Sequence, residues 1–256
     1  MATGRTTENW MRVYADGYDL SGYTRSIGPL AQEFAATPVA AFSDAVKNVL
    51  VGQGKLSIGA LNGFFDNTAV NGLHTVLAAG GTKRVVMIPI GIRAAPAQGD
   101  PALIGEFEQG AYKAVALDGY ISVNLPFEDV SNQAAQLAYT KPWGWLLHAK
   151  GAETAVNTAV GIDDNGAASA LGGYMCYQIF TANGTATVKV QDAATNSNGS
   201  FSDLSGATSG SVDASASPKS GIVALGVTAT VRRYLRWQIV LGTATTVTFA
   251  LAFVRG

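Results

Sequence analysis

The second half of the chain is a series of short, β-prone segments separated by turn residues, and this spacing constrains the fold more than any other feature. The segments are rich in β-branched and aromatic residues and span residues 174–180, 185–193, 221–229, 232–241 and 245–254. Short strands at this spacing are typical of a β-sandwich. Residues 194–220 consist almost entirely of Ser, Thr, Asn, Gly, Ala and Asp. That composition predicts a long loop or a mobile hairpin outside the core.

The first half is also predicted to be mainly β structure. Residues 12–14 lead into Asp16 and Gly17, a hairpin signal, because Asp and Gly tolerate the positive φ angles that such turns need. Further strands are predicted over residues 55–65, 84–92, 102–115 and 120–127. Pro89 lies inside the second of them and indicates an edge, a bulge or an irregular segment, because proline cannot donate to a strand ladder.

Two short helices are expected beside these strands. The first has Thr37 as its N-cap and Pro38 at its first position, and it ends at Gly52. The second starts near Asp66 and ends at Gly80. Each carries one apolar stripe and therefore needs a sheet to lie against.

The composition changes after Trp145, which indicates two domains. Residues 151–173 are mostly small and polar, and we interpret them as a linker and the start of a second unit. The predicted domains are therefore residues 1–150 and residues 151–256. A chain of 256 residues is long enough for one large β domain or two small ones.

Charge is scarce in this chain. Charged residues make up 14% of it, against roughly a quarter in typical soluble domains. Low charge suits a protein that packs against copies of itself, and a generous internal core would explain it equally well. With a net charge of −1, the chain as a whole is not attracted electrostatically to nucleic acid or to an anionic membrane.

Compartment and redox signals are also few. Cys176 is the only cysteine, which excludes an intramolecular disulfide and a cysteine-based zinc cluster. The N-terminus lacks the apolar region of a secretory signal. No apolar run approaches the roughly 18 residues of a membrane span. We therefore expect folding in a cytoplasm and no membrane partner.

No motif predicts catalysis, a cofactor or a metal site. Nucleophilic catalysis needs a base, usually His, but His74 and His148 lie in no catalytic motif, and we interpret both as structural or surface residues. Two isolated His and one Cys match no metal-ligand spacing. Residues 163–166, Asp-Asp-Asn-Gly, resemble half of a calcium loop but lack the rest of its pattern, which favours a plain turn. The chain is not expected to be an enzyme.

Glu106 and Glu108 form the best acidic pair. On a strand, residues two apart share one face and lie roughly 6.5–7 Å apart, a separation that overlaps with the carboxylate pairs of glycosidases. The sequence places no aromatic cleft around them, so we favour a solvated or lumen-facing sheet edge. Phe107 between them would then point into the core.

Arginine and aromatic residues gather in one segment near the C-terminus. On a strand, Arg232, Tyr234 and Arg236 share one face and Trp237 lies on the other. The three are a candidate surface-binding cluster, because such a face could stack on a sugar or a base. We favour the solvated outer face of a sandwich strand, with Trp237 in the core.

Residues 12–127 resemble the major tail (tail tube) proteins of long-tailed bacteriophages. The matching segments are VYADGYDLSGY with residues 24–30, the helix expected over residues 44–50, LSIGALNGFFDNTAVNGLHTVL, RVVMIPIGI, and GEFEQ leading into YISVNLPF. The segment from TATVKVQDA to TFALAFVR resembles β-sandwich modules appended to virion proteins. The resemblance implies a mainly β fold: an N-terminal β-sandwich or barrel with one or two short helices, and a C-terminal β-sandwich domain.

The resemblance also implies a structural role in the virion tail. Tail tube subunits form hexameric rings that stack into a hollow tube, and their strands line the channel through which the genome passes. The expected partners are copies of this chain, other tail proteins, and passing double-stranded DNA without specific binding. Assembly is expected in the cytoplasm of the host bacterium. Glu106 and Glu108 are then candidates for the channel lining.

The connection between residues 94 and 101, long for a hairpin and rich in Pro and Gly, is expected to project and to reach a neighbouring subunit. Its candidate contact residues are Ala94, Pro96, Gly99, Asp100 and Pro101. Two alternatives remain open. One is a head decoration or fibre-type virion protein, and the other is a carbohydrate-binding module that uses Tyr234, Arg236 and the long polar loop.

Overall fold

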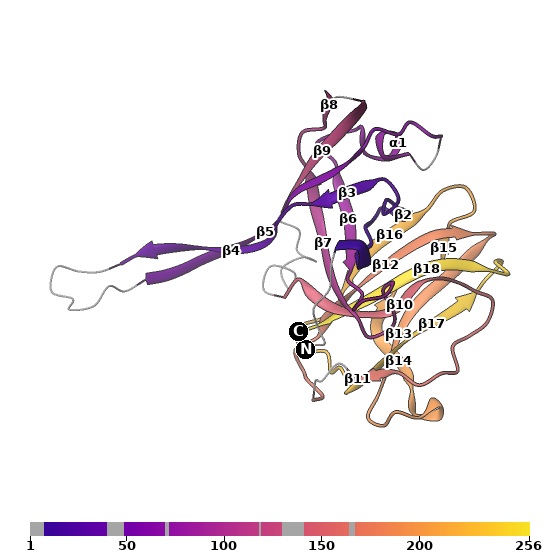
Figure 1. Ribbon diagram of the computed structural model, residues 1–256. Coiled ribbons are helices and arrows are strands. Elements are labelled where there is room, and N and C mark those ends of the chain that lie inside the picture. The colour runs from indigo at the N-terminus through magenta and orange to yellow at the C-terminus, as the bar shows by residue number, and fades with distance from the viewer. Residues whose placement is uncertain (1–7, 40–48, 70–71, 118, 130–140, 164–166) are drawn as a thin grey trace.

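The chain folds into mainly β structure in the computed structural model (Figure 1), as the sequence predicts. The structure describes residues 8–39, 49–69, 72–117, 119–129, 141–163 and 167–256. The strands of the first half are β1 (Tyr14–Ala15), β2 (Tyr18–Asp19), β3 (Thr24–Ile27), β4 (Leu30–Pro38), β5 (Val49–Phe64), β6 (Lys83–Pro89), β7 (Pro101–Gln109), β8 (Lys113–Leu117) and β9 (Tyr120–Asp129). The strands of the second half are β10 (Trp143–Glu153), β11 (Ile162–Asp163), β12 (Gly173–Ala182), β13 (Thr185–Ala193), β14 (Ser202–Thr208), β15 (Val212–Asp213), β16 (Lys219–Ala224), β17 (Tyr234–Leu241) and β18 (Val247–Arg255). The helical elements are α1 (Leu73–Leu77) and the 3-10 turns η1 (Glu8–Trp10) and η3 (Asn198–Ser200).

Within the described residues, the strands form one sheet of thirteen and one of five. The larger sheet runs in the order β16-β12-β18-β10-β7-β6-β1-β2, and β9 attaches β5 and β8 to β7. The smaller sheet runs β11-β17-β13-β14, with β15 beside β13. Strand β10 pairs with β18 on one side and with the start of β7 on the other. The domain boundary predicted between residues 150 and 151 falls inside β10, so the two halves share one sheet.

Three apolar clusters form the core. The first fills the sandwich of the second half and includes Phe249, Leu251 and Ile239. The second lies in the first half, around Leu61, Phe107 and Leu125 together with α1. The third joins the halves, because Met87 and Ile104 of the first half pack with buried residues of β12 and β18. Close packing therefore continues across the middle of the chain.

The turn between β1 and β2 ties the first half to the second. Asp16 and Gly17 have φ angles of 51° and 81°, which confirms the predicted hairpin turn. The Asp16 carboxylate accepts hydrogen bonds from Val85 N and from an Arg84 guanidinium nitrogen, each at 2.9 Å. Gly17 N donates to Gln178 Oε1 of β12 at 2.5 Å, and Gln178 Nε2 donates to Val85 O at 2.9 Å. The larger sheet thus curls so that β12 lies against the first hairpin.

Both helix predictions need correction. Thr37 and Pro38 lie in β4, and Gly52 lies in β5, where an antiparallel register pairs Thr37 with Leu50. Strand pairing between distant residues therefore overrides the local helix signals at both ends of the first predicted helix. Its middle part, residues 40–48, lies outside the described residues. The second helix exists only as α1, which is shorter than predicted. No described helix is long and apolar enough to cross a membrane.

Two strand predictions are also corrected. Residues 102–115 do not form one strand, because β7 ends at Gln109 and β8 begins at Lys113. Residues 194–220 were expected outside the core, but they contain β14 and β15. Leu204, Ala207 and Ala214 of this segment are buried in the sandwich core. These few apolar side chains lie on the inner side of the segment, and the many small polar residues around them conceal that pattern.

Candidate functional site

Strands β4 and β5 form an arm that projects from the body (Figure 1). Ser57 of β5 pairs with β9, whereas among the described residues the register from Gly54 outward pairs β5 with β4 alone. Phe34 on β4 and Val39 directly after it are 45% and 43% exposed. An isolated two-stranded hairpin is only marginally stable in water. The arm is therefore a segment whose apolar side chains gain from a partner outside this chain.

Strand β8 is an exposed edge of the larger sheet. It pairs with β9, and each of its five residues is exposed. Val115 lies opposite Ser122, which in turn lies opposite Phe64, so Val115 and Phe64 share one face. Val115 is 51% exposed and Leu117 is 46% exposed. An apolar edge strand of this kind is a template for pairing with another chain.

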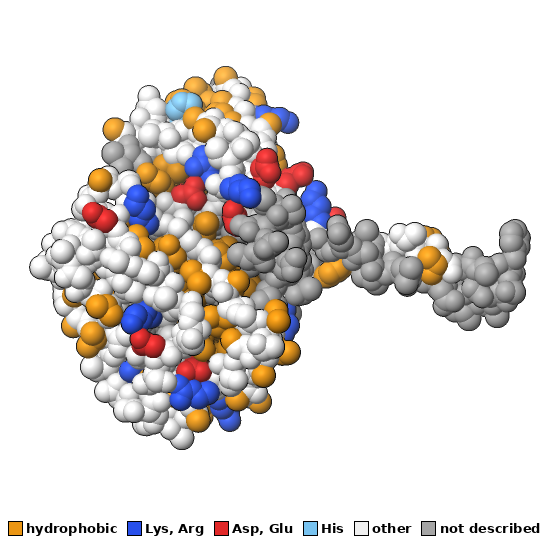
Figure 2. Space-filling model, turned by 180° about the vertical axis from the view of Figure 1, so that it is seen from behind, with side chains coloured by type: hydrophobic (Ala, Val, Ile, Leu, Met, Phe, Trp, Pro, Cys, Tyr) orange, Lys and Arg blue, Asp and Glu red, His pale blue; other side chains and the backbone are white. Residues whose placement is uncertain are grey.

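Charged side chains form a row across the sheet near the base of the arm. Phe107 is fully buried, so Glu106 and Glu108 point to the opposite face of β7, and Glu108 is exposed. Glu108 lies directly opposite Glu128 on β9 and Lys83 on β6. Glu128 pairs with Lys55 at 3.5 Å. Figure 2 shows both signs of charge gathered where the arm meets the body.

The sequence identified Glu106 and Glu108 but missed the rest of this row. The alternation along β7 places the two glutamates on one face and Phe107 in the core, as expected. Lys55, Lys83 and Glu128 come from three other strands, so only the pairing register could have identified them. Whether this face lines a channel stays a prediction.

The loop before β7 has one exposed part and one fixed part. Ala94 and neighbouring residues are exposed, and Pro96 is half-buried. Gly99 N donates to Leu146 O of β10, and Leu146 N donates to Asp100 O, both at 2.8 Å. Pro101 is already the first residue of β7. The exposed residues are those that remain available for a contact between subunits.

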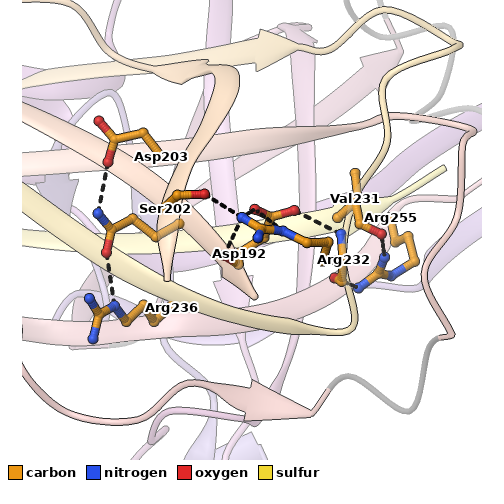
Figure 3. A network of polar contacts seen from close by, with 8 residues as sticks. Asp192, Ser202, Asp203, Val231, Arg232, Arg236 and Arg255 are labelled. Carbon is orange, nitrogen blue, oxygen red and sulfur yellow. Dashed lines mark hydrogen bonds and ion pairs between the residues drawn. The ribbon is translucent and has the colours of Figure 1, made fainter. Parts of the chain in front are cut away.

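The arginine cluster is held by internal polar contacts (Figure 3). Arg236 is only 4% exposed, so the expectation that it lies on a solvated outer face is wrong. Its Nε donates to Gln191 Oε1 at 2.9 Å, its Nη1 donates to Asn198 Oδ1 at 2.7 Å, and its guanidinium lies 4.4 Å from the centre of the Phe201 ring. The segment between β13 and β14 therefore covers Arg236, whereas Trp237 is in the core as predicted.

Arg232 anchors the same segment from the other end of the network (Figure 3). Its backbone N and its Nε donate to the two carboxylate oxygens of Asp192, at 2.8 and 3.0 Å. It also contacts the Ser202 hydroxyl. Hydrogen bonding to Asp192 raises the pKa of Arg232 above its ordinary value. Tyr234, the third member of the predicted cluster, lies under the Arg233 guanidinium at 5.3 Å.

Both histidines pack among aromatic rings. His148 is buried and stacks on Phe249 with ring centres 4.1 Å apart, and its Nε2 lies 2.9 Å from a carboxylate oxygen of Glu153. Burial lowers the pKa of His148, although the hydrogen bond to Glu153 opposes this shift. His74 Nδ1 lies 2.8 Å from the Tyr112 hydroxyl. Among the described residues, no group of three or more His, Cys, Asp or Glu side chains could hold a metal ion.

Comparison with known proteins gives no family assignment. No protein-family model matches the sequence, and no curated protein matches it. Among solved structures, the chain is similar to the SPP1 Dit (gp 19.1) protein, described as a paradigm of the hub adsorption apparatus in phages that infect Gram-positive bacteria. The match covers 96% of this chain and 99% of that chain, with 12% sequence identity and a TM-score of 0.30. A likeness at this TM-score carries no argument about fold or function.

Proposed function

We propose that this chain is a structural protein of a bacteriophage tail, and that copies of it assemble into stacked, hexameric rings around a channel for the genome. The observation that carries the proposal is the arm formed by β4 and β5. The sequence resemblance to tail tube proteins supplies the kind of assembly, and the arm supplies a physical reason for it. A chain that projects a hairpin with exposed apolar side chains is built to contact another molecule.

The arm would bind a neighbouring copy through its apolar side chains. Phe34 and Val39 are nearly half exposed, so covering the exposed part of each would contribute roughly half of the about 1.5–3 kcal/mol that complete burial of such a side chain is worth. The edge of β8 would supply a second contact, because an unpaired strand edge accepts a strand from a partner. Both surfaces lie in residues 1–150, which we propose as the assembly domain, with residues 151–256 on the outside of the ring.

The charged row would face the channel. The row sets the three carboxylates of Glu106, Glu108 and Glu128 against the two ammonium groups of Lys55 and Lys83. A lining with net negative charge limits long-lived contacts with DNA phosphates. We expect the double variant Glu106→Lys, Glu108→Lys to assemble but to slow or block genome ejection. Ejection at the parent rate would contradict a channel location. The exposed residues near Ala94 would contact the adjacent ring.

Electron microscopy and light scattering of the purified chain test the proposal. We expect six-fold rings or tubes from the parent, and mainly monomers from the double variant Phe34→Ser, Val39→Ser. A matched control is Val156→Ser, Val227→Ser, because both valines are exposed and lie outside the arm. The control should assemble like the parent.

Three results would overturn the proposal. A parent that stays monomeric at high concentration would contradict it. Trimers would favour a head decoration or fibre-type protein. Saturable binding to a glycan array by a monomeric chain would favour a carbohydrate-binding module.

A further inference from the structure

A polar hollow lies beside the first hairpin. Two short stretches of chain line it, one just before β1 and one from the end of β2 into β3. Its polar lining comes from Asn9, Arg12, Ser21, Thr24, Arg25 and Ser26. None of the described lining residues is acidic. The hollow is therefore lined by two arginines and by three residues that carry a hydroxyl group.

The hairpin holds these two stretches side by side. Val13 N donates to Ser21 Oγ at 2.9 Å, and Leu20 N donates to Val13 O at 2.8 Å. Thr24 N and Thr24 Oγ1 both donate to Leu20 O, at 3.1 and 2.9 Å. Arg12 and Arg25 are thirteen positions apart in sequence, yet this clamp brings both to the wall of one hollow.

The two arginines differ in their partners from three other arginines of the chain. Arg84, Arg232 and Arg233 each form an ion pair with an aspartate. Among the described side chains, neither Arg12 nor Arg25 forms an ion pair. Arg12 donates to the carbonyl oxygens of Asn9 and Met11, and Arg25 donates to the Tyr120 hydroxyl. Since a guanidinium has five N–H donors, both retain donors for a ligand.

We propose that this hollow binds a phosphate group. Guanidinium groups match the geometry of phosphate oxygens and hold them through charge-assisted hydrogen bonds. Two positive charges balance a phosphate dianion. The Ser26 hydroxyl can donate to one of its oxygens, because the Ser21 and Thr24 hydroxyl groups already donate to Asp19 Oδ1 and Leu20 O. A monocarboxylate offers one charge and two oxygens, and it would leave one guanidinium without a partner.

The charge of the chain favours a small phosphate-bearing ligand over a length of DNA. Non-specific DNA binding rests on several phosphate contacts made by Lys and Arg. The net charge here is −1, and the hollow contributes two cations. The ligand is therefore an isolated phosphate group, either free or at the end of a larger molecule.

Calorimetric titration of the full-length parent with inorganic phosphate at low ionic strength tests the inference, with acetate as the carboxylate arm. We expect saturable binding of phosphate and at least about tenfold weaker binding of acetate. The double variant Arg12→Gln, Arg25→Gln should bind phosphate at least about tenfold more weakly, because it removes both charged hydrogen-bond donors. Circular dichroism checks that the variant is folded. The single variant Arg12→Lys should bind phosphate more tightly than the single variant Arg12→Gln, because lysine keeps the positive charge.

The matched control is Lys141→Gln, Lys219→Gln, which removes the same charge from exposed positions outside the hollow. It should bind phosphate like the parent. No saturable phosphate binding by the parent, equal losses in the two double variants, or acetate binding as tight as phosphate would overturn the inference. Displacement of phosphate by a short DNA duplex, with a steep salt dependence, would identify a DNA contact and overturn the small-ligand assignment.

Discussion

The two halves of the chain place their large apolar side chains differently. In the second half, Phe249 and Trp237 lie inside a sandwich, and even the guanidinium of Arg236 is covered and hydrogen-bonded. In the first half, Phe34 and Val115 lie on an arm and on a sheet edge, where about half of each side chain is exposed. The second half therefore packs these large aromatic rings internally and leaves exposed aliphatic side chains such as Val156 and Val227, whereas the first half places exposed apolar side chains on a projecting arm and on a sheet edge.

The largest expected effect on the free energy of unfolding is the difference between a Phe→Ala substitution in the second half and one in the first half. Phe249→Ala removes a fully buried ring from the sandwich core and should lower the free energy of unfolding by about 3–5 kcal/mol. Phe34→Ala makes the same chemical change on the arm and should alter it by about 0.5 kcal/mol or less. Urea denaturation of the dispersed protein measures both. Equal losses would show that the arm is part of the folded core and would end the contrast between the halves.

The sequence predicts the second half better than the first, and the reason is physical. Strand β13 (Thr185–Ala193) matches its prediction to the residue, because its alternation follows one buried face. Around Thr37 and Gly52 the helix signals are local, whereas the pairing of β4 with β5 depends on contacts between distant residues. The predicted face of Glu106 and Glu108 follows from alternation, but Glu128 and Lys83 follow only from register. The hollow between Arg12 and Arg25 needs the folded hairpin and carries no sequence signal.

A second prediction concerns the joint between the halves. Gln178 is fully buried, and it accepts from Gly17 N and donates to Val85 O. Gln178→Ala removes both hydrogen bonds and leaves the Gly17 N–H buried without its acceptor. We expect a loss of about 2–3 kcal/mol in the free energy of unfolding. The control Gln98→Ala changes an exposed glutamine and should have almost no effect.

The shape of the unfolding curve sharpens this second prediction. With an intact joint, both halves should unfold in one transition, because β10 and the Gln178 contacts connect them. Gln178→Ala should separate the transitions, with the first half unfolding at lower urea. A single transition in the variant, with unchanged midpoint, would show that the shared sheet alone couples the halves.

The smallest expected effect is a pH dependence at the same joint. Asp19 of β2 pairs with Lys150 of β10 at 2.7 Å. Burial raises the pKa of Asp19, but hydrogen bonds from Lys150 and Ser21 outweigh burial and hold the pKa below its ordinary value of 3.8. A carboxylate with a lowered folded pKa stabilises the fold above the unfolded pKa, and this stabilisation is lost as the pH falls through the folded pKa.

Asp19→Asn should therefore lower the free energy of unfolding by about 0.5–1 kcal/mol at neutral pH, since both partners are partly exposed. The difference between parent and variant should shrink as the pH falls below 3.8 and should be lost once the pH falls through the lowered pKa of folded Asp19, where the parent carboxylate is protonated. Denaturation at a series of pH values measures it. A difference that persists at low pH would mean that the substitution acts through something other than the charge of Asp19. The ion pair would then be incidental to the joint.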